Sequence, residues 1–275
     1  MAIDQRQVQR PRILLLHNTP SREDVAIDYG TFETQVADAL TAGGAGITAA
    51  DVELVVVRTF EGPDELAKVP ADAAAAGFFC AIFSGSKFDV TMRLPWMLTL
   101  EEWIVRHAKR GFPMLGICFG HQLFATALGG DARVNPRGCE VGSYTVRRVD
   151  GSAAAAAADP LVSQLPAEFP TLNIHAQSVE ALPEGAVAFY ESDIDRNQLV
   201  RFATNCYGTQ FHPEFTPALV QSIARYIPYG TQTEADQARI AAAEACPAST
   251  SILAKFVKLY MPSAASDVRE ADAEG

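Results

Sequence analysis

The sequence is poor in the features that mark secreted, zinc-binding and membrane-spanning chains. Its 275 residues include five cysteines, an odd number, and no two of them form a Cys-x-x-Cys pair. A disulfide framework and a zinc site are therefore not expected, and a reducing compartment, the cytoplasm, is predicted. The longest apolar run, Ala73 to Phe83, covers about half of the ~20 residues that cross a bilayer, so no membrane partner is expected.

Basic residues are also in the minority. The chain carries 22 Lys and Arg against 33 Asp and Glu, which gives a formal net charge of −11 at pH 7. The long-range field of such a chain repels nucleic acids, so no nucleic-acid partner is predicted. No P-loop, no dinucleotide-binding glycine motif and no cluster of metal-ligand residues is visible, so neither a cofactor nor a metal is expected.

In the first half of the chain, short apolar runs alternate with amphipathic stretches. The runs predict buried strands over residues 12–16, 52–58, 78–83 and 113–117. The stretches between and after them predict helices over residues 32–40, 64–69, 94–109 and 120–128. Strands that alternate with helices are typical of a parallel sheet covered on both faces.

After Gly129 the pattern changes to short strand-like runs. These runs, at residues 141–149, 171–174, 187–191, 199–203 and 207–211, predict an antiparallel or mixed addition to the same sheet. The expected fold class is α/β: a three-layer sandwich with a mainly parallel central sheet, a small antiparallel β extension and a C-terminal helical tail. We expect one domain over residues 1–229 and an appended segment, helical and then acidic, over residues 230–275.

Cys118 stands where a predicted strand runs into a predicted helix, with Gly116 and Gly120 two residues away on either side. This spacing is the cysteine form of the nucleophile elbow, in which glycines make room for a sharp turn. A helix N-terminus favours a thiolate, and the backbone N–H of Phe119 would point to a developing oxyanion. A buried, inert role is the ordinary alternative for a free cysteine.

A base for this nucleophile is found further along the chain. His212 and Glu214 follow the last predicted strand, and residues two apart in extended backbone project to the same side. The histidine can accept the thiol proton, and the carboxylate can hold the imidazole in the right tautomer. Because both segments lie at strand ends, they are predicted to meet at the carboxyl edge of the sheet, where open α/β proteins place their sites.

These two segments, in this order, resemble the class I glutamine amidotransferases, whose motifs are G-x-C-x-G-x-Q and His-Pro-Glu. Both motifs match residue for residue, and the resemblance extends from about Ile13 to Tyr226. Ser84-Gly85-Ser86 and the segment from Asn135 to Gly142 resemble the stand-alone branch similar to the guanosine monophosphate synthetase amidotransferase domain. That branch includes γ-glutamyl peptidases.

The resemblance implies a role for each matched residue. Cys118 would attack the γ-carboxamide carbon, His212 would move the protons, and Glu214 would orient His212. The backbone N–H groups of Phe119 and Gly85 would form the oxyanion hole.

Gln122 and His175 are the substrate-binding residues that the resemblance implies. For His175, a role as a strand-end histidine satisfied by its neighbours is the alternative. The chain departs from the family pattern at Ser84-Gly85-Ser86, where many members carry Gly-Gly-Pro, and at Cys139, where relatives often have tryptophan.

The implied reaction converts glutamine to glutamate and ammonia through a γ-glutamyl thioester. The chain has no ATP-pyrophosphatase signature such as S-G-G-x-D-S, so the ammonia would pass to a separate synthetase partner chain. A self-sufficient γ-glutamyl peptidase acting on glutathione-like conjugates is the first alternative. A non-catalytic regulatory or assembly partner is the second, and the intact Cys-His-Glu set makes it the least favoured.

Overall fold

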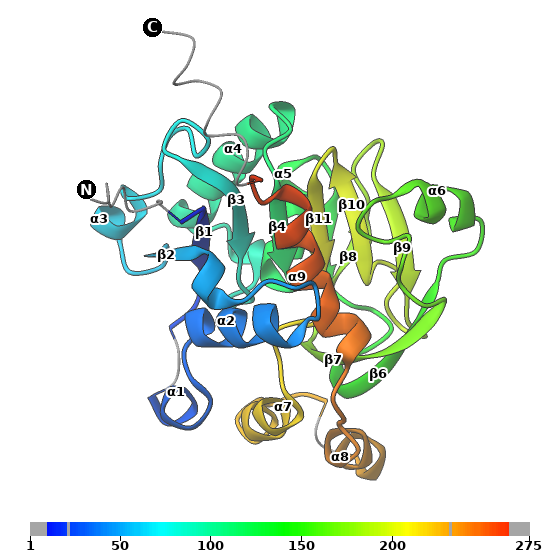
Figure 1. Cartoon of the computed structure of the whole chain (residues 1–275). Coiled ribbons are helices and arrows are strands. Elements are labelled where there is room, and N and C mark those ends of the chain that lie inside the picture. Colours follow the sequence, from blue (N-terminus) through cyan, green and yellow to red (C-terminus); the bar gives the residue numbers. More distant parts are fainter. Residues whose placement is uncertain (1–9, 21–22, 231–232, 264–275) are drawn as a thin grey trace, which may run out of the picture.

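The computed structural model describes residues 10–20, 23–230 and 233–263, and most of its strands join one sheet (Figure 1). The strands of this sheet are β1 (Arg12–His17), β2 (Glu53–Arg58), β3 (Phe78–Phe83), β4 (Met114–Ile117), β6 (Glu140–Arg148), β7 (Glu168–His175), β9 (Val187–Glu191), β10 (Leu199–Ala203) and β11 (Cys206–Thr209). Their order across the nine-stranded sheet is β2-β1-β3-β4-β11-β10-β9-β6-β7. A second, two-stranded sheet pairs β5 (Asp131–Val134) with β8 (Gln177–Ala181).

The large sheet is mixed, with a parallel part and an antiparallel part. Neighbouring strands from β2 to β11 run parallel, and those from β11 to β7 run antiparallel. The predicted α/β fold class is thus confirmed. β11 belongs to both parts: it is antiparallel to β10 and parallel to β4, with Thr209 beside Ile117. The carboxyl ends of β4 and β11 therefore open at the same edge of the sheet.

Helices cover both faces of the large sheet (Figure 1). They are α1 (Glu23–Tyr29), α2 (Phe32–Ala42), α3 (Pro63–Leu66), α4 (Pro95–Lys109), α5 (Phe119–Ala127), α6 (Ala153–Ala158), α7 (Pro217–Ala224), α8 (Glu234–Ala241) and α9 (Pro247–Tyr260), with single 3₁₀ turns η1 (Ala49–Asp51) and η2 (Val90–Met92). Residues of α2 and α9 share one large hydrophobic core cluster, and residues of α4 and α5 share a second large one. The sheet separates these two clusters.

β1 shows why its sequence is apolar without interruption. Ile13 and Leu15 point into the cluster with α2 and α9, whereas Leu14 and Leu16 point into the cluster with α4 and α5. All four side chains have no exposed surface. Burying each of them contributes about 1.5–3 kcal/mol to folding. A strand covered on both faces therefore needs an apolar residue at every position, not at every second one.

The C-terminal helix α9 is part of the core. Leu253, Ala254, Phe256 and Val257 have no exposed surface and pack on the same face of the sheet as α2. The predicted boundary between residues 229 and 230 stays a prediction, but α9 completes the layer that α2 begins. The acidic tail, residues 264–275, lies outside the described residues.

No helix within the described ranges is long and apolar enough to cross a membrane. The small β5–β8 sheet and α1 have no counterpart in the sequence prediction. β5 carries a single buried residue, Ala132, so its sequence lacks the apolar alternation that indicates a strand.

Candidate active site

Cys118 occupies the turn between β4 and α5 in a strained backbone conformation. Its φ of 50° and ψ of −99° are rare for a residue with a side chain and cost about 1–3 kcal/mol. The flanking glycines make the turn possible. A Cβ on Gly116 would lie 2.5 Å from the carbonyl carbon of Gly120, and one on Gly120 would lie 2.7 Å from Cβ of Phe83. The spacing of the motif is therefore a packing requirement.

Backbone hydrogen bonds hold this turn in place. The N–H of Cys118 donates to the carbonyl of Thr209 at 2.7 Å, which ties the turn to the end of β11. The carbonyl of Cys118 accepts the N–H of Gln122 at 3.0 Å, the first bond of α5. Phe119, the first residue of α5, has an N–H without an acceptor inside the helix. The positive end of the helix dipole therefore lies at the sulfur.

His212 and Glu214 lie beside Cys118. Nδ1 of His212 is 2.8 Å from Oε1 of Glu214, which leaves Nε2 as the ring atom that can face the sulfur. Cys118 is close enough to His212 to raise the pKa of the imidazole. The His212 ring stacks on Phe215 with 3.8 Å between the ring centroids. Its backbone N–H donates to Leu172 of β7 at 2.9 Å. Three strands, β4, β11 and β7, thus contribute to the position of these two side chains.

The electrostatics of the site favour a charged imidazole. Burial alone would lower the pKa of His212, but the charge of Glu214 and the hydrogen bond with Cys118 raise it to about 10. Cys118, His212 and Glu214 are each no more than 6% exposed, so water screens these charges weakly. The arrangement can hold a thiolate next to an imidazolium, which is a reactive nucleophile with a proton donor beside it.

Gly85 approaches the same point from the loop after β3. A Cβ on Gly85 would lie 2.8 Å from Cε1 of His212 and 3.6 Å from Cβ of Cys118. The loop is braced by Asn18: its backbone N–H donates to Oγ of Ser84 at 2.9 Å, and its carbonyl accepts from Oγ of Ser86 at 2.8 Å. The backbone of Gly85 therefore lies against both the nucleophile and the base.

A family model for class I glutamine amidotransferases matches residues 82–222, just over half of the chain. The chain belongs to this family. The matched region includes the Gly85 loop, Cys118, His212 and Glu214.

Two kinds of name occur among the curated relatives of this amidotransferase. One subunit of the glutamine-hydrolyzing GMP synthase of Archaeoglobus fulgidus is 36% identical over 106 residues, which cover 37% of this chain and 52% of the relative. Gamma-glutamyl peptidase 4 of Arabidopsis thaliana is 31% identical over 137 residues, which cover 49% of this chain and 53% of the relative. The chain thus spans about half the length of these two relatives.

Solved structures share the fold over nearly the whole chain. A glutamine amidotransferase from Thermotoga maritima has a TM-score of 0.65 at 16% identity, covering 93% of this chain and all of the other. A glutamine amido transferase from Methylobacillus flagellatus has a TM-score of 0.64 at 21% identity, covering 92% of this chain and 94% of the other. At these identities the likeness establishes the fold.

Substituting Gly85 with alanine is expected to lower kcat/KM at least about 100-fold. The new methyl group would lie 2.8 Å from Cε1 of His212, closer than van der Waals contact allows, so the imidazole would have to move away from its position beside Cys118. Thermal unfolding should change little, since the loop stays anchored to Asn18. Steady-state kinetics and a melting curve of the same preparation check both statements. Full activity in the folded variant would show that the loop does not lie against His212.

His175 lies in a buried polar network behind the nucleophile. Its Nε2 is 2.8 Å from Oε2 of Glu140, and its Nδ1 is 2.9 Å from the carbonyl of Gln177. Both partners can only accept, so both ring nitrogens must carry protons and the ring is an imidazolium. Burial would lower the pKa of His175, but the hydrogen bond with Glu140 and its charge raise it to about 9.

Glu140 is the anionic centre of this network and has no exposed surface. Besides His175, its carboxylate accepts from the side chains of Asn173, Ser192 and Gln198. Burial would raise the pKa of Glu140, but these hydrogen bonds and the charge of His175 lower it. Glu140 and His175 therefore form a buried ion pair.

Sequence reasoning did not single out Glu140, Asn18 or Gln210. Gln210 donates from Nε2 to Sγ of Cys118 at 3.5 Å. The signal for Gln210 was its place in the His-Pro-Glu segment, and the signal for Glu140 was a lone acid at the start of an apolar strand. Nothing in the sequence indicated the role of Asn18 beyond its place after β1. Its hydrogen-bond partner Ser84 lies 66 residues further along the chain, so no local pattern connects the two.

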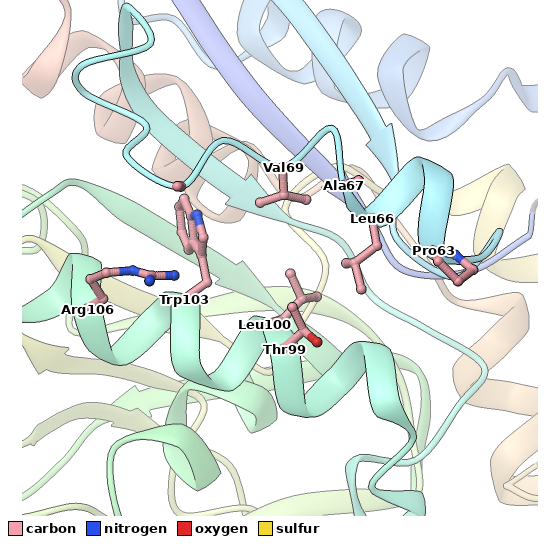
Figure 2. Close-up of a pocket in the computed structure, with 9 residues that line it drawn as sticks. Pro63, Leu66, Ala67, Val69, Thr99, Leu100, Trp103 and Arg106 are labelled. Atoms are coloured by element: carbon pink, nitrogen blue, oxygen red, sulfur yellow. The ribbon is translucent and has the colours of Figure 1, made fainter.

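Within the described part of the chain, no group of three or more His, Cys, Asp and Glu residues could hold a metal ion. A hollow elsewhere on the molecule lies between α3 and α4 (Figure 2). It is lined by Pro63, Leu66, Ala67, Val69, Ala71, Thr99, Leu100, Trp103 and Arg106. It contains none of the residues of the Cys118 site.

Proposed function

We propose that the chain is a cysteine-dependent enzyme that hydrolyses the γ-amide of glutamine to glutamate and ammonia. The observation that carries the proposal is the strained turn that presents Cys118 to His212, which is itself held by Glu214. A strained, buried nucleophile beside a charged imidazole costs stability, and that cost is typical of catalytic sites.

In the proposed reaction, Sγ of Cys118 attacks the amide carbon, and the N–H groups of Phe119 and Gly85 hold the oxyanion. His212 gives its Nε2 proton to the departing nitrogen, so ammonia leaves and a γ-glutamyl thioester remains. His212 then takes a proton from water, and the hydroxide attacks the thioester. Collapse of this second intermediate releases glutamate and returns the thiolate.

Gln122 is the residue we propose to contact the substrate directly. Its Nε2 already donates to Gln177 and to Gln210, at 3.1 and 3.0 Å, so its Oε1 is the atom that can accept from an amino group. His175 has both ring nitrogens engaged, so a contact with substrate would come from its ring carbons. We propose that the main role of His175 is to hold the backbone carbonyl of Gln177 through Nδ1.

We propose that the ammonia passes to an acceptor enzyme on a separate chain. One finding supports this. The similar archaeal protein is named as one subunit of a glutamine-hydrolyzing GMP synthase.

The second candidate is a self-sufficient γ-glutamyl peptidase that acts on glutathione-like conjugates. The observation that favours it is the aligned region with the plant peptidase, which is longer than that with the archaeal GMP synthase protein, 137 against 106 residues. The chemistry at Cys118 would be the same, with an amino acid nitrogen as the leaving group in place of ammonia.

Glutamate release from two substrates tests the choice between these functions. The purified chain is incubated with glutamine and, separately, with glutathione, and kcat/KM is measured for each. We expect glutamine to be preferred, because its leaving group needs no pocket beyond the amide. A preference of about 100-fold or more for glutathione would replace the amidotransferase proposal with the peptidase.

A further inference from the structure

A chain of amide hydrogen bonds ends on the sulfur of Cys118. Gln210, the residue after β11, donates from Nε2 to Sγ at 3.5 Å and accepts at Oε1 from Nε2 of Gln122 at 3.0 Å. Gln122 also donates to the backbone carbonyl of Gln177 at 3.1 Å. Gln122 is 4% exposed and Gln210 has no exposed surface, so these bonds do not compete with bulk water.

The direction of each hydrogen bond follows from the anchor at Gln177. A backbone carbonyl can only accept, so Gln122 must turn Nε2 toward it, and the second hydrogen of that nitrogen points to Gln210. Gln210 must therefore present Oε1 to Gln122 and Nε2 to the sulfur. The reverse orientation would set two N–H groups against each other and an oxygen against Sγ.

The anchor is itself held from the other side. The carbonyl of Gln177 accepts from Nδ1 of His175 at 2.9 Å, and His175 is fixed by Glu140. A buried ion pair thus fixes the carbonyl that orients both glutamines. The network has a rigid end at Glu140 and a reactive end at Cys118.

We propose that Gln210 is a further catalytic residue, which stabilises the thiolate of Cys118 through its N–H, and that Gln122 is the positioning residue that orients it. The inference rests on the proposed function, in which Cys118 is the nucleophile. A neutral thiol gains little from this donor, and its own proton faces the carbonyl of Ile174 at 3.8 Å. A thiolate gains more, because a hydrogen bond to an ionised acceptor is about twice as strong as one to a neutral acceptor.

The two imidazoles that flank the sulfur keep their charge below pH 8. The titratable groups there are His121 on α5, His175 with Glu140 from β7 and β6, His212 with Glu214 after β11, and Tyr229 after α7 with Asp89 beside it. The pKa of His175 is raised to about 9 and that of His212 to about 10, so both are cationic below pH 8. Burial raises the pKa of Tyr229 and lowers that of His121 to about 3, so both are neutral there.

The test measures the reactivity of the Cys118 thiol as a function of pH. The full chain is treated with iodoacetamide between pH 5 and 9, and the modified Cys118 peptide is quantified by mass spectrometry. The peptide with Cys139, a partly exposed cysteine, is the internal reference. In Gln210→Leu the midpoint of the rate of Cys118 modification against pH should rise by about one to two pH units, while the rate for Cys139 at each pH stays the same.

Two further variants make the result decisive. Gln210→Glu keeps an oxygen for Gln122 but removes the N–H from the sulfur, so its midpoint should rise at least as far. Gln35→Leu is the matched control, because Gln35 donates to the carbonyl of Gly30 near the start of α2. A wild-type midpoint in either folded Gln210 variant overturns this inference alone. A wild-type Cys118 that reacts no faster than Cys139 overturns the proposed function instead.

Discussion

Replacing Cys118 with alanine is expected to lower kcat by at least about 10⁴-fold, because the proposed covalent intermediate forms on its sulfur. The change removes one sulfur atom from a side chain that is 6% exposed, so the folded structure should persist. Glutamate release and a melting curve measure the two effects. Cys246→Ala is the control, since Cys246 lies at the start of α9, in a cluster with Leu172 and Val220.

A chloroketone analogue of glutamine tests the role of Cys118 without turnover, because it alkylates the nucleophile. Alkylation should occur at Cys118 in the wild type and be absent from Cys118→Ala. Turnover that survives in the alanine variant would contradict the nucleophile assignment.

Cys118→Gly separates catalysis from stability. Glycine adopts a φ of 50° without the penalty of a side chain, so this variant should be inactive and yet more stable. We expect a gain of about 1 kcal/mol, which raises the melting temperature by about 2–4 °C. A glycine variant that melts below the wild type would show that the turn stores no strain.

The second large effect is expected on stability. Glu140→Gln should lower the free energy of unfolding by about 3–5 kcal/mol, because it leaves the buried imidazolium of His175 without its counter-charge. The new amide also turns its N–H groups toward side chains that donated hydrogen bonds to the carboxylate, among them Asn173 and Ser192. Denaturant unfolding measures the change. Glu53→Gln, which affects a partly exposed pair with Arg12, should cost less than about 1 kcal/mol.

The difference in free energy of unfolding between the wild type and Glu140→Gln should depend on pH, and this dependence gives a sharper check. The pKa of folded His175 is raised from 6.5 to about 9, so its contribution is complete below pH 6.5 and is lost as the pH rises through 9. The pKa of folded Glu140 is lowered from 4.5, so its contribution is present above pH 4.5 and is lost in acid. The free energy of unfolding of the wild type should therefore exceed that of Glu140→Gln by the largest amount between about pH 5 and 8. An equal difference at pH 6 and pH 10 would contradict the ion pair.

Local sequence patterns carried most of the fold prediction. Leu14, Leu15 and Leu16 predict a strand buried on both faces, and the structure places them so. The patterns failed where an element owes its existence to a distant neighbour. β5 pairs with β8 across more than forty residues, and its own residues are mostly exposed. Periodicity cannot reveal such a strand, because its hydrogen bonds and not its side chains define it.

The amino-acid sequence by itself singled out the residues that meet at the turn. Cys118 between two glycines, and His212 two residues before Glu214, could be read without coordinates, because each pattern depends on residues close together in the chain. The α/β class followed in the same way, from the alternation of apolar runs and helical stretches.

Only the tertiary structure decided what surrounds that chemistry. Glu140, His175 and Gln122 come from β6, β7 and α5, Gln210 follows β11, and their hydrogen bonds span up to 92 residues of sequence. The direction of each bond depends on the next partner, back to a carbonyl in β8. A network of this kind is a property of packing, since burial makes every unpaired donor and acceptor costly.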